Sequence, residues 1–270
     1  MALDPRRHAF RDDLADIRLQ GRVAAGRFVA PEPMQVSAAI ADVHADRSGS
    51  GLTSQVLHGE PIAVFEIADG MAWVQGADGY VGYVAADALG PATDVPLIVT
   101  ATMAQVYAAA DIKSPVHNTL PFLARVPDHG TAGEFRKTGT GYLHHRHLTP
   151  IAGDMVSFAE LFIGTPYLWG GRSYLGLDCS ALIQLAAMAC GVNAPRDSDM
   201  QCAELGRYLP EDEDLLRGDL IFWSGHVGMM VDGDTLLHSN GYHMATVAEP
   251  LNTAVARIGE HGPVVARKRL

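Results

Sequence analysis

The chain has 270 residues, of which 48% are hydrophobic and 19% are charged, and its formal net charge is -11. These proportions are typical of a globular protein that buries hydrophobic cores, and they exclude a disordered chain. The excess of negative charge argues against a general basic surface for nucleic acid or anionic membrane, so we expect neither partner.

The first 33 residues are polar and end in Pro31-Glu32-Pro33. Their start is charged and lacks the apolar core of a signal peptide, and no run in the chain approaches the roughly 18 apolar residues of a membrane helix. Three cysteines are too few for a disulfide framework, which agrees with a reducing compartment. We therefore expect a cytoplasmic protein whose residues 1–33 form a short helix or an arm laid over a neighbouring domain.

Short apolar runs with a period of two fill residues 34–95, for example Ile62–Ile67 and Tyr80–Val84. The tripeptides Ala68-Asp-Gly70 and Ala77-Asp-Gly79 separate such runs and are typical of turns between antiparallel strands. This segment is predicted to be a small antiparallel barrel of four to six strands.

Residues 96–150 repeat this pattern, since Asp42-Val-His-Ala45 recurs as Gln105-Val-Tyr-Ala108, 63 positions later. We interpret the repeat as a second barrel. The two barrels, the first ending in Asp78–Val84, resemble bacterial SH3-like domains, and that resemblance implies a module of the kind that binds cell-wall peptides. The alternative is that the barrels are generic spacers, because a fold does not determine a function.

A histidine cluster lies near the end of the second barrel. Adjacent residues of a strand point to opposite faces, and no carboxylate or cysteine accompanies the histidines at ligand spacing, so no metal site is expected. The cluster consists of His144, His145 and His147.

Residues 151–270 show helical spacing first and strand-like runs later. Asp154 can cap a helix over Met155–Ile163, and a glycine-rich loop leads into an apolar helix over Ala181–Ala189 that Gly191 ends. A short helix over Asp199–Tyr208 and an antiparallel meander then complete an α+β domain. The strands are expected at Asp219–Trp223, His226–Val231, Thr235–His238 and Ala245–Ala248, and the basic run Arg267–Arg269 is expected to be a solvated tail.

Cys179 lies at the first turn of the apolar helix. Unpaired N–H groups and the partial positive charge at a helix N-terminus favour a thiolate, so the pKa of this thiol is expected to fall below about 8.5. The alternative is an inert cysteine packed under the helix start. Cys190 and Cys202 are expected to be buried and unreactive.

His226 and His238 are the candidate partners of Cys179, because a cysteine nucleophile needs a base and the base needs a third group to orient it. If Asp232-Gly-Asp234 is a three-residue turn, Gly228 opposes His238 and both histidines lie on one face of the sheet. A two-residue turn would put them on opposite faces. The alternative role for each histidine is structural.

Three blocks of the sequence from Pro166 to Ser239, taken in chain order, resemble the NlpC-type cysteine peptidases, which have a papain-like fold and cut murein peptides. The resemblance implies that Cys179 is the nucleophile, His226 the base and then the acid, and His238 the residue that orients His226. Backbone N–H groups at the helix start would bind the oxyanion, with Tyr167 as a side-chain donor. The blocks are Pro166–Gln184, Arg217–Gly228 and Leu237–Ser239.

Two SH3-like barrels before such a domain resemble the γ-D-glutamyl-L-diamino acid endopeptidases, which act on free murein peptides with an unblocked N-terminal L-Ala. By this resemblance Ser180 and Asp197 hold the substrate amine, while Glu60 and Tyr80 close the end of the cleft. Their alternatives are a helix cap for Asp197, a turn carboxylate for Glu60 and a barrel-core ring for Tyr80.

Two further groups complete the predicted site. Trp169 and Gln184 are expected to be mainly packing residues, with Trp169 also a wall of the cleft. Because the substrate is acidic, Arg172 or Arg196 is expected to meet its carboxylates.

The sequence thus predicts an α+β protein in which a papain-like (NlpC-type) domain, residues 151–270, follows an arm at 1–33 and two small SH3-like β-barrels at 34–95 and 96–150. The predicted function is cytoplasmic cysteine endopeptidase of murein recycling, with no metal or cofactor and with a murein peptide as partner. A non-catalytic murein-peptide binding protein and an amidase or acyltransferase on the same scaffold are the alternatives.

Overall fold

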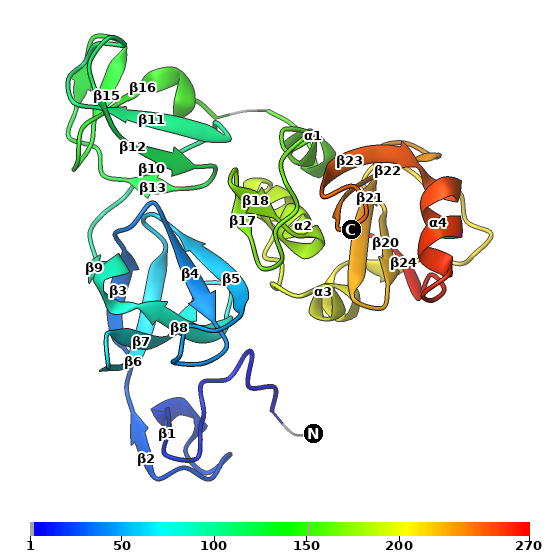
Figure 1. The fold of residues 1–270 in the computed structure, drawn as a ribbon, viewed down its shortest axis with the longest axis horizontal. Coiled ribbons are helices and arrows are strands. Elements are labelled where there is room, and N and C mark those ends of the chain that lie inside the picture. Colours follow the sequence, from blue (N-terminus) through cyan, green and yellow to red (C-terminus); the bar gives the residue numbers. More distant parts are fainter. Residues whose placement is uncertain (1–2, 151) are drawn as a thin grey trace. The chain divides into compact units, whose positions relative to one another are not determined.

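The computed structural model describes residues 3–150 and 152–270, which Figure 1 draws as a ribbon. The contacts between Cα atoms divide the chain into two units, Met1–Pro150 and Ile151–Leu270. None of the helices among the described residues is both long and apolar enough to cross a membrane.

The first unit contains a seven-stranded antiparallel sheet with the order β5-β4-β8-β7-β6-β3-β9. Asp69 and Gly70, both with positive φ, form the turn between β6 and β7, as the sequence predicts. The sheet has seven strands rather than the four to six expected, because short segments at the beginning and at the end of this part of the sequence also pair with it. Its strands are β3 (Glu32–Val36), β4 (Ile40–His44), β5 (Leu52–Leu57), β6 (Pro61–Ala68), β7 (Met71–Gly76), β8 (Val81–Ala85) and β9 (Leu89–Pro91), and a 3-10 turn, η2 (Ala86–Ala88), precedes β9.

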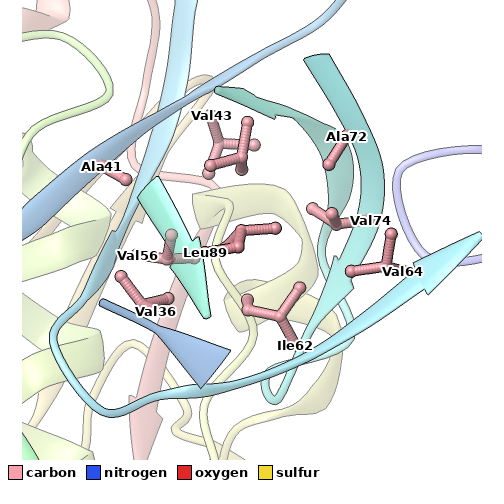
Figure 2. Close-up of a cluster of buried hydrophobic side chains, with 10 residues drawn as sticks. Val36, Ala41, Val43, Val56, Ile62, Val64, Ala72, Val74 and Leu89 are labelled. Atoms are coloured by element: carbon pink, nitrogen blue, oxygen red, sulfur yellow. The ribbon is translucent and has the colours of Figure 1, made fainter. Parts of the chain in front are cut away.

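Apolar side chains on alternate strand positions make the core of this sheet. Figure 2 shows labelled side chains of β3, β4, β5, β6, β7 and β9 directed toward one another, among them Val43, Ile62 and Val74. All three are at most 2% exposed, which is the burial that the period of two predicts.

The N-terminal segment lies over an outer face of the same sheet. Ala9 and Leu14 pack with Phe65 and Trp73 in a second buried cluster, and the Arg11 guanidinium lies 4.4 Å from the centre of the Trp73 ring. The segment therefore behaves as the predicted arm. Its elements are the parallel pair β1 (Leu14–Asp16) and β2 (Arg27–Val29), with the 3-10 turn η1 (Ile17–Leu19).

A five-stranded antiparallel sheet with the order β12-β11-β16-β15-β14 follows in the first unit. Its first hairpin repeats the β4–β5 hairpin: β11 (Met103–Tyr107) lies 63 positions after β4, and both hairpins shift register at their last pair, at Val43/His44 and Val106/Tyr107. The other strands are β12 (Val116–Pro121), β14 (Thr131–Ala132), β15 (Phe135–Lys137) and β16 (Tyr142–His144), and β10 (Leu97–Ile98) pairs with β13 (Arg125–Val126). The hairpin repeat is a structural fact, while the assignment of this part as a second SH3-like barrel stays a prediction.

Most of the histidine cluster lies outside the strands. His144 is the last residue of β16, and His145 and His147 lie in the 3-10 turn η3 (His145–His147). The expectation that adjacent histidines diverge is therefore wrong: the rings of His144 and His145 stack at 4.8 Å, and Glu134 brings a carboxylate to them across the β15–β16 hairpin. The absence of a metal site here stays a prediction.

The second unit is built on a six-stranded antiparallel sheet with the order β19-β24-β20-β21-β22-β23. The predicted meander forms its centre, with strand ends that differ from the prediction by at most two residues. The strands are β19 (Arg207–Tyr208), β20 (Leu220–Trp223), β21 (His226–Met230), β22 (Thr235–Asn240), β23 (Ala245–Pro250) and β24 (Ala266–Arg269), and a separate small hairpin comprises β17 (Arg172–Ser173) and β18 (Gly176–Leu177).

Four helices accompany this sheet: α1 (Met155–Glu160), α2 (Cys179–Ala189), α3 (Ser198–Glu204) and α4 (Leu251–Gly259). Asp154 caps α1, as predicted, by accepting a hydrogen bond from the Ser157 N–H. Helix α2 contacts α1, β21 and β22. Helix α4 was not predicted, although Leu251, Ala254 and Ile258 follow helical spacing and pack on the cluster that contains Met230 and Leu236.

The basic run at the end is not a solvated tail. It forms β24, between β19 and β20, and Lys268 is only 2% exposed. The Lys268 ammonium donates to the Cys202 carbonyl at 2.7 Å and lies 4.4 Å from the centre of the Tyr208 ring. The prediction from charge alone was wrong because these partners satisfy the buried charge.

Candidate active site

Helix α2 begins at Cys179, two residues before the predicted start. Asp178 is its N-cap, and the Asp178 carboxylate accepts the Ala181 N–H at 2.8 Å. Cys179 therefore occupies the first helical position, with a side chain only 7% exposed. This confirms the predicted placement of the cysteine at a helix N-terminus.

Asp178 also ties the glycine-rich loop to the helix. Its carboxylate accepts the Gly170 N–H at 2.9 Å, and Gly170 has a φ of +75°, a conformation that favours glycine. The backbones at Gly171 and Gly176 pass too close to neighbouring atoms for a side chain. A Cβ on Gly171, for example, would lie 2.4 Å from the Gly176 oxygen. The loop sequence thus fixes where the peptide chain enters α2.

The structure corrects the prediction for Arg196. This side chain is 1% exposed, and its guanidinium donates to both carboxylate oxygens of Asp178, at 2.9 and 2.7 Å, and to the Ser180 hydroxyl at 2.9 Å. Arg172 is also buried, and its Nε donates to the Gln184 side chain at 2.7 Å. Both arginines hold the interior around α2 rather than a surface for substrate carboxylates, and Gln184, 0% exposed, packs there as predicted.

The predicted decrease in the pKa of Cys179 is also wrong. Burial raises the pKa of the thiol to about 12, and the adjacent Asp178 charge adds to the increase. Hydrogen bonds from the Val227 and Ser180 backbones and the Arg196 charge lower the pKa, but they do not offset the burial. Burial of the helix start thus favours the protonated thiol form of Cys179.

The two histidines lie together on one face of the sheet, as the three-residue turn predicts. Met229 pairs with Leu237 and Met230 with Leu236, and the Val231 N–H donates to the Thr235 carbonyl at 2.8 Å. His226 Nε2 is 2.8 Å from His238 Nδ1.

Gly228 leaves the space that this histidine pair needs. A Cβ at this position would lie 2.8 Å from the Leu236 side chain and 3.2 Å from the Cβ of His238. The absence of a side chain at Gly228 therefore lets β21 and β22 approach closely enough for His238 to contact His226.

Two residues that the sequence analysis missed continue the chain of contacts. His238 Nε2 is 2.7 Å from the Glu249 carboxylate, and Arg257 of α4 donates to both oxygens of that carboxylate. On β23, Glu249 is two residues beyond Val247, which pairs with His238, so Glu249 is a same-face diagonal neighbour. The period of two could have found Glu249 had the predicted strand not ended at Ala248.

Burial sets the protonation of both histidines. It lowers the pKa of His226 to about 3, and the nearby His238 and Arg257 lower it further, while Asp178 and Glu249 oppose the decrease. Burial also lowers the pKa of His238, against the opposing effect of Glu249. Both imidazoles are therefore neutral near pH 7, the form in which a histidine can accept a proton.

Tyr167 lies within electrostatic reach of Cys179. Burial, followed by the charges of Cys179 and Asp178, raises the pKa of Tyr167 to about 12, so its hydroxyl stays protonated and can donate a hydrogen bond. Trp169, in contrast, is 68% exposed, which rules out the packing role expected for it. Its role as a wall of the cleft stays a prediction.

The predicted amine-binding residues of the second unit have separate surroundings. The Ser180 hydroxyl is buried and donates to Asp178 at 3.2 Å, while it accepts from Arg196. Asp197 stands at the N-cap of α3 but makes no side-chain capping hydrogen bond, so the helix-cap alternative does not explain its carboxylate.

Glu60 and Tyr80 belong to the first unit, where each has the structural role named as its alternative. The Glu60 carboxylate accepts the Leu57 N–H at 2.9 Å, within its own turn. Tyr80 packs against the buried cluster of the seven-stranded sheet. Their contact with a substrate amine stays a prediction.

The expected burial of the other two cysteines was wrong, while their lack of reactivity stays a prediction. Cys190 is exposed at the C-cap of α2, and Cys202 is partly exposed. Among the three cysteines, Cys179 alone is buried and lies at a helix start beside the histidine strand.

Comparison with known proteins finds matches to two families. Residues 164–257 match the NlpC/P60 family, and residues 44–89 match the bacterial dipeptidyl-peptidase SH3 domain. A γ-D-glutamyl-L-lysine dipeptidyl-peptidase of Bacillus subtilis is 40% identical over 96 residues, which cover 33% of this chain and 32% of the relative. The protein of that name from Bacillus cereus is 30% identical over 145 residues, covering 50% and 43%. The chain thus spans less than half the length of these relatives.

A solved structure shows the same fold. The crystal structure of an NlpC/P60 family protein from Bacillus cereus aligns with a TM-score of 0.75 over 88% of this chain and 99% of its own, at 20% sequence identity. The match to the SH3 family lies within the seven-stranded sheet of the first unit, from the last residue of β4 to the first residue of β9.

Proposed function

Because the chain carries an NlpC/P60 domain together with a bacterial SH3 domain, we propose that it is a cysteine endopeptidase that hydrolyses the γ-D-glutamyl-L-diamino acid bond of murein peptides. NlpC/P60 peptidases are cysteine peptidases, and the relatives named above carry the γ-D-glutamyl-L-lysine specificity in their names. The observation that carries the proposal is the His226–His238 pair at 2.8 Å, on the two strands β21 and β22 that contact the Cys179 helix.

The first step is the attack of Cys179 on the γ-carbonyl carbon of D-glutamate. The neutral imidazole of His226 takes the thiol proton as the bond from Sγ to carbon forms, because a thiol with a pKa of about 12 supplies almost no free thiolate at pH 7. The carbonyl π electrons move to the oxygen. His226 then gives the proton to the departing amine, the C–N bond breaks, and a thioester remains.

Donors at the start of α2 stabilise the oxyanion. Backbone N–H groups there, Cys179 among them, have no partner within the helix, and the protonated Tyr167 hydroxyl is the side-chain donor. In the second half of the reaction His226 removes a proton from water, which attacks the thioester, and the proton returns to the sulfur as the C–S bond breaks. The reaction therefore needs only groups of this chain and water.

The preference for a free N-terminal L-Ala is part of the proposal. An ammonium group that leaves water needs a carboxylate or hydroxyl partner, and Asp197 offers a carboxylate that does not cap its own helix. Acetylation of the alanine amine should therefore slow cleavage, and Asp197→Asn should reduce the difference between the free and the acetylated peptide. The cytoplasmic location and the roles of Glu60 and Tyr80 stay predictions.

The proposed function is tested by incubating the protein with L-Ala-γ-D-Glu-diaminopimelate and with the lysine analogue, and following the free diamino acid by mass spectrometry. Cys179→Ala should abolish release, whereas Cys190→Ala, which changes an exposed cysteine, should keep it. No release by the wild type, or equal release by the Cys179 variant, contradicts the proposal. Transfer of the dipeptide to an added amine, rather than to water, would identify an acyltransferase.

A further inference from the structure

We propose that Glu249 and Arg257 form a positioning pair that fixes the tautomers of both histidines and so presents the unprotonated Nδ1 of His226 to the nucleophile. The inference rests on the proposed cysteine peptidase chemistry. It concerns two residues that the Cys-His-His scheme does not use.

The pair joins three elements of the second unit. Glu249 lies on β23, its side chain is 10% exposed, and it is 2.7 Å from Nε2 of His238, whose side chain is 0% exposed. Arg257, at the end of the second turn of α4, donates to Glu249 Oε2 at 2.8 Å and also to Oε1. The Arg257 guanidinium lies 4.4 Å from the centre of the Tyr242 ring, which holds it from the other side.

The protonation state of Glu249 determines every hydrogen in the chain of contacts. The Arg257 hydrogen bonds lower the pKa of Glu249 to about 2, so the carboxylate is ionised and can only accept. His238 must then carry its proton on Nε2, and its neutral Nδ1 is an acceptor. His226 donates to that Nδ1 from Nε2, which leaves the lone pair of His226 on Nδ1.

Without this pair, the opposite arrangement is equally available to two neutral imidazoles. His238 could carry its proton on Nδ1 and donate to His226 Nε2, and His226 Nδ1 would then hold a proton and could not act as a base. An ionised carboxylate at the far end excludes that state, because it has no proton to donate to His238 Nε2. Two features of the sequence are therefore sufficient to exclude the wrong tautomer. Glu249 lies on the sheet face of His238, and Arg257 lies about two turns into the next helix.

Arg257 has a second effect through its charge. It lowers the pKa of both histidines, whereas Glu249 raises it. Three other titratable groups face these residues: Asp178, which raises the pKa of His226; His243, whose Nδ1 is 4.0 Å from Glu249; and Tyr242, whose ring lies 4.4 Å from the Arg257 guanidinium. The two members of the pair should therefore shift the acid limb of the pH profile in opposite directions.

Three variants test the pair with the full chain. The amide of Glu249→Gln can donate to His238 Nε2 and so permits the wrong tautomer. We expect kcat to fall about 10- to 100-fold while KM stays within about twofold, because the loss is part of the roughly 10²- to 10⁴-fold rate increase that general base catalysis supplies. Arg257→Met should move the acid limb of kcat/KM to higher pH. Glu260→Gln, which removes an exposed carboxylate at the end of the same helix, is the matched control and should behave as wild type.

The nitrogen-15 chemical shifts of histidine-labelled protein give a readout that needs no substrate. In the wild type, Nδ1 of His226 should have the shift of an unprotonated imidazole nitrogen, and in Glu249→Gln part of the population should have the shift of a protonated one. A protonated Nδ1 in the wild type would overturn the proposal even if no variant folds, and so would an unchanged kcat in Glu249→Gln. If the wild type shows the expected shifts but cleaves no murein peptide, the tautomer proposal stands and the proposed function fails.

Discussion

Replacement of Arg196 by methionine should destabilise the second unit more than any exposed charge substitution. The substitution leaves the Asp178 carboxylate buried, with its side chain 10% exposed, and without the two guanidinium hydrogen bonds of 2.7 and 2.9 Å. Removing one partner of a buried ion pair costs about 3–5 kcal/mol. Asp178 keeps the N–H donors of Gly170 and Ala181, so we expect the lower end, about 3 kcal/mol, or a decrease in Tm of about 10 °C.

A double variant separates the charge from the shape of the site. Asp178→Asn keeps a capping oxygen for the Ala181 N–H but removes the charge, and asparagine is as good an N-cap as aspartate. The combination of Asp178→Asn with Arg196→Met should therefore be more stable than Arg196→Met alone, by about 2 kcal/mol of the buried-charge cost.

Urea and thermal unfolding, followed by tryptophan fluorescence, measure these differences. Arg207→Met, at an exposed ion pair with Glu213, is the matched control and should leave the midpoint unchanged. The reasoning is refuted if Arg196→Met lies within about 1 kcal/mol of the wild type, or if the double variant is no more stable than the single one. Loss of Arg196 also removes a charge that lowers the pKa of Cys179, so the folded variant should cleave more slowly.

Three further outcomes are expected. Because the pKa of His226 lies near 3 and that of Cys179 near 12, the imidazole is neutral and the thiol is protonated throughout the range from pH 5 to 7.5. Values of kcat/KM measured over that range should therefore be constant. A decrease in kcat/KM toward the acid end of the range would contradict the assignment of His226 as the base. Gly228→Ala should cost about 1–3 kcal/mol in urea unfolding and lower kcat at least about tenfold, since its Cβ would displace His238, whereas Gly259→Ala, which meets no atom within 4 Å, should do neither. Deletion of residues 266–270 should prevent the second unit from folding, as judged by circular dichroism, because β24 joins β19 to β20; a folded and active deletion variant would restore the view of a dispensable tail.

Local rules in the sequence were sufficient for much of the fold and for the centre of the site. The turn residues Asp69 and Gly70, the cap Asp154 and the glycines before Cys179 act through neighbours within a few positions of the chain. The His226–His238 pairing also followed from the sequence, because the length of one turn sets the register of a hairpin and register sets the face.

Tertiary structure decided the properties that depend on distant residues. The pKa of Cys179 rises because the helix start is buried, a cost that outweighs the local effect of the helix N-terminus. Arg196 and Lys268 were assigned to the surface by their charge, but Asp178, the Cys202 carbonyl and the Tyr208 ring give them partners inside the fold. Glu249 and Arg257 acquire their roles only when β23 and α4 close around His238. The sequence by itself therefore predicted that Cys179, His226 and His238 lie together, whereas burial and partners far along the chain determined their charge states, since desolvation and long-range ion pairs leave no local pattern.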